Sequence, residues 1–159
     1  MCNMKIELRP MRADEFTRYL DYFVPDYAAE ISSNYSLPHD EALARASQEI
    51  SEDLAQGVDT PGHALLCITD KADVIGYLWY KPDRQARSVF IYDFCILPAH
   101  QGKGYGKKAL SAFEAMLVRD GFEQIGLRVA ADNEPAQNLY LKGGFHATGI
   151  NMIRRIGRG

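Results

Sequence analysis

The stretch of sequence best suited to chemistry is a glycine-rich turn. Three glycines stand at alternate positions in 102–106, between an apolar run, Val89–Leu97, and an amphipathic stretch, Gly104–Asp120. Glycine lets a ligand approach the main chain closely, and the first N–H groups of a helix lack internal partners. No acid lies between Asp93 and Glu114, whereas three lysines do. The turn therefore predicts an anion site at a helix N-terminus.

Several interpretations of these glycines compete. A Walker-type loop would need four residues between glycines and then Gly-Lys-Ser/Thr, which are absent. A dinucleotide fingerprint can be aligned with 104–109, but its acid should follow about 20 residues later, and Asp132 lies too far along. A purely structural turn also fits. The pattern Gln-x-x-Gly-x-Gly, met by Gln101, Gly104 and Gly106, resembles the acetyl-CoA pyrophosphate loop of the GNAT superfamily of N-acetyltransferases.

A second pattern follows about thirty residues later and resembles that family's other signature. It is Asn-x-x-Ala-x-x-Leu-Tyr over 133–140, followed by Gly144-Phe145. Asn133 is a good helix cap. Tyr140, seven residues on, returns to nearly the same helix face about 10 Å along the axis. Without the first motif, Tyr140 would be interpreted as an amphipathic residue packed at a helix end, with its hydroxyl in water.

The resemblance implies a single N-acetyltransferase domain over residues 4–157. The implied fold is α/β (α+β), a mixed central sheet of about six to seven strands flanked by four helices, with splayed parallel central strands. It also implies acetyl-CoA as co-substrate and no metal. The cofactor-binding residues that it implies are Phe94, Cys95, Ile96, Gln101, Gly102, Lys103, Gly104, Tyr105, Gly106, Lys107 and Asn133.

The mechanism implied is direct attack of an amine on the thioester, with Tyr140 protonating the departing CoA thiolate. Some family members carry a Glu base where this chain has Arg128, so Asp93 is the best carboxylate. Asp93 could equally be a salt-bridged or capping acid at a strand edge, and His63 or an ordered water could replace it as the base. A Cys95 nucleophile is disfavoured, because a lone cysteine in an apolar strand is usually a core residue.

The charge distribution bears on the acceptor. The chain has 159 residues and a net charge of −3, but residues 13–59 hold eleven acids and two bases, a net of −9. These acids are either solvated helix faces or a wall that attracts a cationic amine. That amine could be a polyamine, an amino acid, an aminoglycoside, or a protein lysine or N-terminus. Tyr22, Tyr27 and Tyr35 could line its pocket or could equally be core or surface aromatics.

Two further functions stay open. A non-catalytic acyl-CoA sensor or interaction module would keep the turn but would not need Tyr140 or Asp93. Transfer of a longer acyl group would need a cation for the extra carboxylate, for which Arg84, Arg87 and Arg128 are candidates. A homodimer is compatible with the family, although no sequence feature requires one.

Composition excludes other classes of protein. The chain is not basic enough for nucleic-acid binding, and no apolar run approaches the roughly 18 residues of a membrane span. Three widely spaced cysteines, Cys2, Cys67 and Cys95, argue against a disulfide framework. We therefore expect a cytoplasmic location.

Apolar periodicity and turn residues predict the elements that must position these residues. They are a strand at Ile6–Pro10, a helix over Phe16–Tyr27 kinked or ended at Pro25, a helix from 37–40 to Gly57, strands at His63–Thr69, Val74–Tyr80 and Val89–Leu97, a helix at Gly104–Asp120, a strand at Gln124–Ala130, a helix at Asn133–Lys142, and a final strand at Phe145–Ile156.

Overall fold

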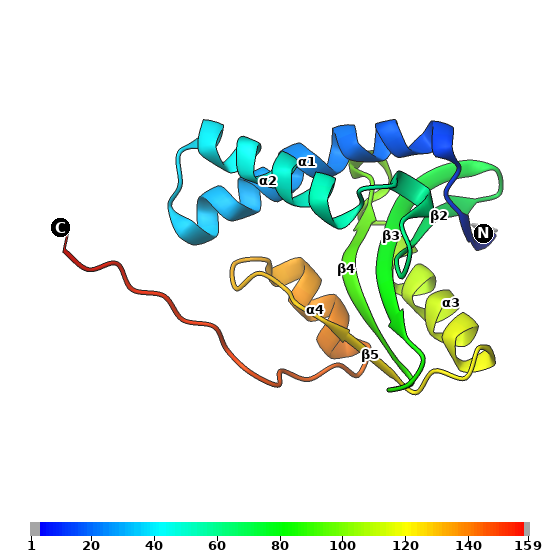
Figure 1. The fold of residues 1–159 in the computed structure, drawn as a ribbon. Coiled ribbons are helices and arrows are strands. Elements are labelled where there is room, and N and C mark those ends of the chain that lie inside the picture. The colour runs from blue at the N-terminus through cyan, green and yellow to red at the C-terminus, as the bar shows by residue number, and fades with distance from the viewer. Residues whose placement is uncertain (1–3, 158–159) are drawn as a thin grey trace.

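The structure, a computed structural model, describes residues 4–157, so Cys2 lies outside the described residues. Its single mixed sheet has the strand order β1-β2-β3-β4-β5, in which β1 to β4 are antiparallel and β5 runs parallel to β4 (Figure 1). The elements are β1 (Ile6–Pro10), α1 (Ala13–Tyr35), α2 (His39–Asp53), the 3₁₀ turn η1 (Gly57–Asp59), β2 (Ala64–Asp70), β3 (Asp73–Asp83), β4 (Ser88–Ile96), the 3₁₀ turn η2 (Pro98–His100), α3 (Tyr105–Arg119), β5 (Gln124–Leu127) and α4 (Glu134–Lys142).

Helices cover both faces of the sheet. Helix α3 packs on one face, where Phe113 is fully buried against Leu78 and the other apolar residues of the central strands. Helices α1 and α2 lie together across the other face (Figure 1). There Tyr19 and Phe23 of α1 pack against Trp79 of β3. No helix of the described part is long and apolar enough to cross a bilayer.

The two parallel strands separate partway along, which confirms the predicted splay. Pairing between β4 and β5 begins at Ser88 and Gln124 and ends at Ile91 and Leu127. Beyond that point β4 continues to Ile96 and is paired only with β3. The β5 side of this last part of β4 is therefore not used by the sheet.

A bulge at Tyr92 decides which way the last part of β4 faces. Trp79 of β3 lies opposite Asp93, but the next residue, Tyr80, lies opposite Ile91, so Tyr92 is an extra residue. In a regular strand Ile91 and Asp93 would share a face, because side chains alternate. Instead, Ile91 packs on the α3 side while Asp93 reaches Tyr19 on the α1 side. The extra residue turns the Asp93 carboxylate toward the α1 side, and bulges near active sites commonly reorient a side chain in this way.

Two element boundaries differ from the prediction. Of the two outcomes predicted at Pro25, a kink or an end of the helix, the end is wrong, since α1 continues to Tyr35. Proline removes one helical hydrogen bond, but buried residues on both sides, Phe23 before it and Ala28 after it, keep the helix against the core. Strand β5 stops at Leu127 rather than Ala130, because the splay removes its partner.

The predicted final strand over 145–156 was also wrong, and the described sheet has five strands rather than six to seven. The residues after α4 run out from the body as an extended trace (Figure 1). A strand requires a neighbour for its backbone groups, and this segment has none within the described chain.

Candidate active site

The glycine-rich turn has an exposed main chain. It follows β4 through Leu97 and η2, and Gln101 holds it in place because its side-chain amide donates to the Ile96 carbonyl at 2.8 Å. Gly102 and Gly104 have φ angles of 77° and 84°, left-handed values that favour glycine. Apart from the adjoining residues of the chain, no heavy atom lies within 4 Å of where a Cβ would stand at either position. A ligand can therefore reach the backbone here.

Helix α3 begins directly after this turn, with Gly104 as its N-cap. Its first N–H groups point toward the turn and lack helical partners. Lys103 and Lys107 are exposed beside them. An anion placed here would meet backbone donors, the positive end of the helix dipole and lysine charges.

Several of the predicted cofactor-binding side chains have structural partners. Besides Gln101, the Tyr105 hydroxyl donates to Asp70 at the end of β2, at 2.5 Å. Asn133 caps α4, because its Oδ1 accepts a hydrogen bond from the Ala136 N–H at 3.2 Å. The capping role expected for Asn133 is confirmed. Tyr105 can serve an anion at the turn through its main chain, since its side chain points to Asp70.

Asp93 stands at the splayed end of β4 and is largely surrounded by protein. The hydroxyl of the fully buried Tyr19 donates to its Oδ2 at 2.8 Å. Burial raises the pKa of Asp93 to about 7, and the negative charges of Asp26 and Glu30 add to that rise, while the Tyr19 hydrogen bond opposes it. A carboxyl with this pKa can take up and release a proton near neutrality.

Tyr140 lies on α4 with only 8% of its surface exposed. Its ring meets the Phe145 ring edge-on, at 5.4 Å between centroids. Burial raises the pKa of Tyr140 to about 12, and the charges of Asp93 and Cys95 add to that rise. The phenol therefore keeps its proton throughout the neutral range, and Asp93 is close enough to influence it electrostatically.

One face of α1 looks onto the same region, with a polar stripe at helical spacing formed by Tyr22, Asp26, Glu30 and Ser33. Burial raises the pKa of both Asp26 and Glu30. Glu30 also lies 3.7 Å from the Arg128 guanidinium, and Ser33 donates to Asp132 at 2.9 Å. Of the acidic segment, Asp26 and Glu30 are therefore the residues of α1 that face the end of β4.

Sequence reasoning noted the acidic segment but missed Tyr19, Asp26 and Glu30 as parts of one site. The available signal was their spacing, since acids at i and i+4 share a helix face. Of the three tyrosines expected near the acceptor, Tyr22 lies beside the Cys95 thiol. The other two face α2, where Tyr27 donates to Glu49 and Tyr35 lies under Arg45.

His63 as a base and Cys95 as a nucleophile are both poorly suited to these roles. His63 accepts a hydrogen bond from the Trp79 indole N–H at 3.0 Å, and burial lowers its pKa. The Cys95 thiol has a raised pKa because it is buried beside Asp93, so the thiolate is disfavoured. Within residues 4–157, no three His, Cys, Asp or Glu side chains are placed to share a metal ion.

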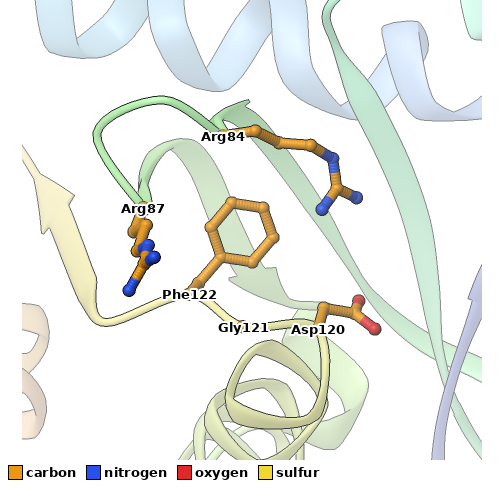
Figure 2. Close-up of a pocket in the computed structure, with 5 residues that line it drawn as sticks. All are labelled: Arg84, Arg87, Asp120, Gly121 and Phe122. Carbon is orange, nitrogen blue, oxygen red and sulfur yellow. The ribbon is translucent and has the colours of Figure 1, made fainter.

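Two of the arginines considered for a longer acyl group lie at the opposite end of the sheet. A hollow of about 330 Å³ is lined by Arg84, Arg87 and Phe122, at the start of β4 (Figure 2). Arg84 lies over the Phe122 ring at 5.1 Å, and Arg87 is paired with Glu123 at 3.1 Å. From Ser88 at this end, β4 runs about 10 Å to its last pair with β5 at Ile91 and about 17 Å to Asp93.

Comparisons with known proteins find similar acetyltransferases. The model of the acetyltransferase (GNAT) family matches residues 19–145. YycN of Bacillus subtilis (strain 168), named an uncharacterised N-acetyltransferase, is 34% identical over 96% of this chain and 100% of its own length. YdgE of the same organism, also named an N-acetyltransferase, is 29% identical over 96% of this chain and 99% of its own length.

Solved structures show the same arrangement of elements. The crystal structure of YycN superposes with a TM-score of 0.90 at 32% identity, covering 97% of this chain and 100% of that chain. PaiA N-acetyltransferase from Thermoplasma acidophilum, solved in complex with coenzyme A, has a TM-score of 0.72 at 16% identity, covering 93% of this chain and 94% of that one.

Proposed function

Because the chain belongs to the GNAT family of acetyltransferases, we propose that it moves an acetyl group from acetyl-CoA directly to a primary amine of a cationic acceptor. The observation that carries this proposal is the splay of β4 from β5. Pairing with β5 ends at Ile91, so the following backbone has groups to offer a ligand, and Asp93 and Tyr140 both lie beside it.

Coenzyme A binds mainly through main-chain groups. The pantetheine arm enters between the separated strands and pairs with the backbone of Phe94, Cys95 and Ile96. The pyrophosphate rests on the N–H groups of 102–107, at the start of α3, with Lys103 and Lys107 supplying positive charge. The open space around Gly102 and Gly104 supports this placement.

The acceptor amine approaches from the α1 side, where Tyr22, Asp26 and Glu30 surround its positive charge. It attacks only as the neutral amine, so a proton must leave first. Asp93 accepts that proton, and Tyr19 orients the carboxylate through the 2.8 Å hydrogen bond. Backbone N–H groups within 94–96 stabilise the tetrahedral oxyanion. Tyr140 then gives its proton to the departing CoA thiolate as the C–S bond breaks, and the phenol is restored by the proton that the attacked nitrogen gives up on becoming an amide.

The acyl group proposed is acetyl rather than a longer acid. A succinyl or malonyl group would need a cation close to the splay for its second carboxylate. Arg84 and Arg87 are at the far end of the sheet, and Arg128 is already beside Glu30. No arginine considered for that role supports the longer chain.

The proposal is tested by measuring thiol release from acetyl-CoA with a panel of amines that includes polyamines, aminoglycosides and lysine peptides. Tyr140→Phe should lower kcat by about 10²–10⁴-fold, the usual contribution of a general acid, while acetyl-CoA binding measured by calorimetry stays within a few-fold. The matched control is Tyr80→Phe, because Tyr80 packs on Phe113 on the α3 side and should turn over normally.

Two results would overturn the proposal. Unchanged turnover in Tyr140→Phe would remove this phenol from the mechanism. Tight acetyl-CoA binding without thiol release from any amine would instead identify a non-catalytic acyl-CoA sensor.

A further inference from the structure

The segment after α4 exposes an apolar surface that the monomer does not cover. Residues 146–157, here called the C-terminal arm, extend away from the body (Figure 1), and every one of them is exposed. Four large apolar side chains lie on it: Ile150 is 78% exposed, Met152 88%, Ile153 67% and Ile156 82%. Such a concentration of apolar surface in water indicates an interaction site.

A complementary surface exists on the same chain, at the β5 edge of the sheet. In the described sheet β5 pairs with β4 alone, so its outer side presents unpaired backbone groups. Apolar surface leads up to this edge. Phe90 and Tyr92 of β4 are 41% and 44% exposed and their rings touch edge-on. The Phe90 ring lies over Gly126 of β5, 3.5 Å from where a Cβ would stand.

The arm does not reach its own β5 edge. Arg155, near the end of the arm, donates to the main-chain carbonyls of Tyr35 at 2.8 Å and Ser36 at 3.3 Å. These carbonyls belong to the C-terminal end of α1, where the helix dipole favours a cation. The arm is thus anchored at the turn between α1 and α2, and within the described residues β5 pairs with β4 and not with the arm.

We propose that the arm of one copy lies along the open β5 edge of a second copy, in a two-fold symmetric dimer. Each arm adds its backbone to the other copy's sheet, as in strand addition, and its isoleucines cover the partner's exposed aromatic surface. The second copy is the occupant because both halves of the contact are on this chain. Exchange of an identical element closes with two-fold symmetry and leaves neither half exposed.

The first test is the oligomeric state of the full chain by sedimentation velocity over a range of concentrations. The wild-type protein should sediment as a dimer in the micromolar range. The double variant Ile150→Glu, Met152→Glu should raise the dimer dissociation constant about 100-fold or more, because it places charges where apolar contact is needed. Both positions are exposed, so the fold of the monomer should be unaffected.

The matched control is Val118→Glu. Val118 is a comparably exposed apolar residue, at 66%, but it lies on α3 and outside the proposed contact. This variant should remain dimeric. Equal weakening of the dimer by Val118→Glu and by the arm variant would contradict the proposal.

Hydrogen exchange distinguishes pairing between copies from pairing within one copy. Amides of 124–127 and of the arm should exchange slowly in the dimer and become fast on dilution below the dissociation constant. Protection of the arm that does not depend on concentration would mean that it folds onto its own sheet, and a wild-type protein that is monomeric at high concentration would also overturn the proposal. Neither result would bear on thiol release by the monomer.

Discussion

The carboxylates of Glu15 and Asp93 lie at neighbouring turns of α1 but have opposite electrostatic surroundings. Glu15, in the first turn of α1, accepts two hydrogen bonds of 2.8 Å from the Arg9 guanidinium of β1. That pairing lowers the pKa of Glu15 to about 2. Asp93 meets Tyr19, one helical turn further along, and burial together with Asp26 and Glu30 raises its pKa to about 7.

The difference teaches how this fold separates structural from chemical acids. A permanent cation keeps Glu15 ionised, so the group fastens α1 to β1 at every pH above its low pKa. Asp93 has a neutral hydrogen-bond donor and acidic neighbours, so its pKa in the folded protein lies near neutral pH. Because its pKa is raised, the ionised Asp93 lowers the stability of the folded protein at neutral pH. Such perturbed groups are common where protons are transferred.

The largest expected difference between the two carboxylates is in their effect on enzymatic activity. Asp93→Asn should lower kcat/KM for thiol release by about 10²–10⁴-fold, because the amide cannot accept the amine proton. Glu15→Gln is the matched control and should stay within a few-fold of wild type. If Asp93→Asn keeps full activity, Asp93 is a structural acid like Glu15.

The pH profile should show the same group at work. Asp93 must be ionised to act as a base, so kcat/KM should rise with pH and level off above about 7. At pH 5 this group alone should lower kcat/KM about 100-fold below the plateau, a factor of ten per pH unit. The acceptor amine also titrates, so the measured quantity is the ratio of wild type to Asp93→Asn. A ratio that stays constant between pH 5 and 8 would place the base elsewhere.

Stability should move in opposite directions at the two sites. The raised pKa of Asp93 means that the folded state binds its proton more tightly than the unfolded state, so stability falls as pH rises from about 4 to about 7. Asp93→Asn should therefore gain about 1–4 kcal/mol in free energy of unfolding at pH 8.

At Glu15 the pKa is lowered, so the stability that it contributes is present above its ordinary pKa of 4.5 and is lost as pH falls toward 2. Glu15→Gln should lose about 1–3 kcal/mol at pH 8. Urea denaturation of both variants measures these changes. A loss of stability in Asp93→Asn at pH 8 would contradict the contrast.

The smallest expected effect concerns Tyr19 as a positioning residue. Its hydrogen bond lowers the pKa of Asp93, so Tyr19→Phe should move the midpoint of the pH profile upward by less than about one unit. Tyr27→Phe is the control, because Tyr27 makes a similar hydrogen bond, of 2.6 Å, to Glu49. A midpoint that does not move in Tyr19→Phe, or moves as much in Tyr27→Phe, would deny Tyr19 this role.

Local patterns were enough to predict the turn and the helices around it. The alternate glycines and the apolar stripe predicted a helix over Gly104–Asp120, and the structure has one over Tyr105–Arg119. Asn133 caps α4 as expected. These features depend on residues near each other in the sequence, whose backbone preferences are local.

Features that depend on distant partners could not be predicted in this way. Strict alternation would put Asp93 with Ile91 in the α3 core, and only pairing with β3 reveals the extra residue at Tyr92. The apolar residues of the C-terminal arm predicted a strand, but a strand forms only where a neighbour accepts its backbone groups. The Tyr19 contact joins residues far apart in the sequence.

The bulge at Tyr92 makes the chemistry depend on which residue of β4 is left out of the pairing with β3. If Tyr92 were paired as a regular residue, strict alternation would turn Asp93 into the apolar layer beneath α3. Losing Tyr92, by contrast, would leave Ile91 and Asp93 as neighbours on opposite faces, and the carboxylate would still face α1. The position of the unpaired residue along β4 therefore matters more for the carboxylate than the type of side chain that Tyr92 supplies.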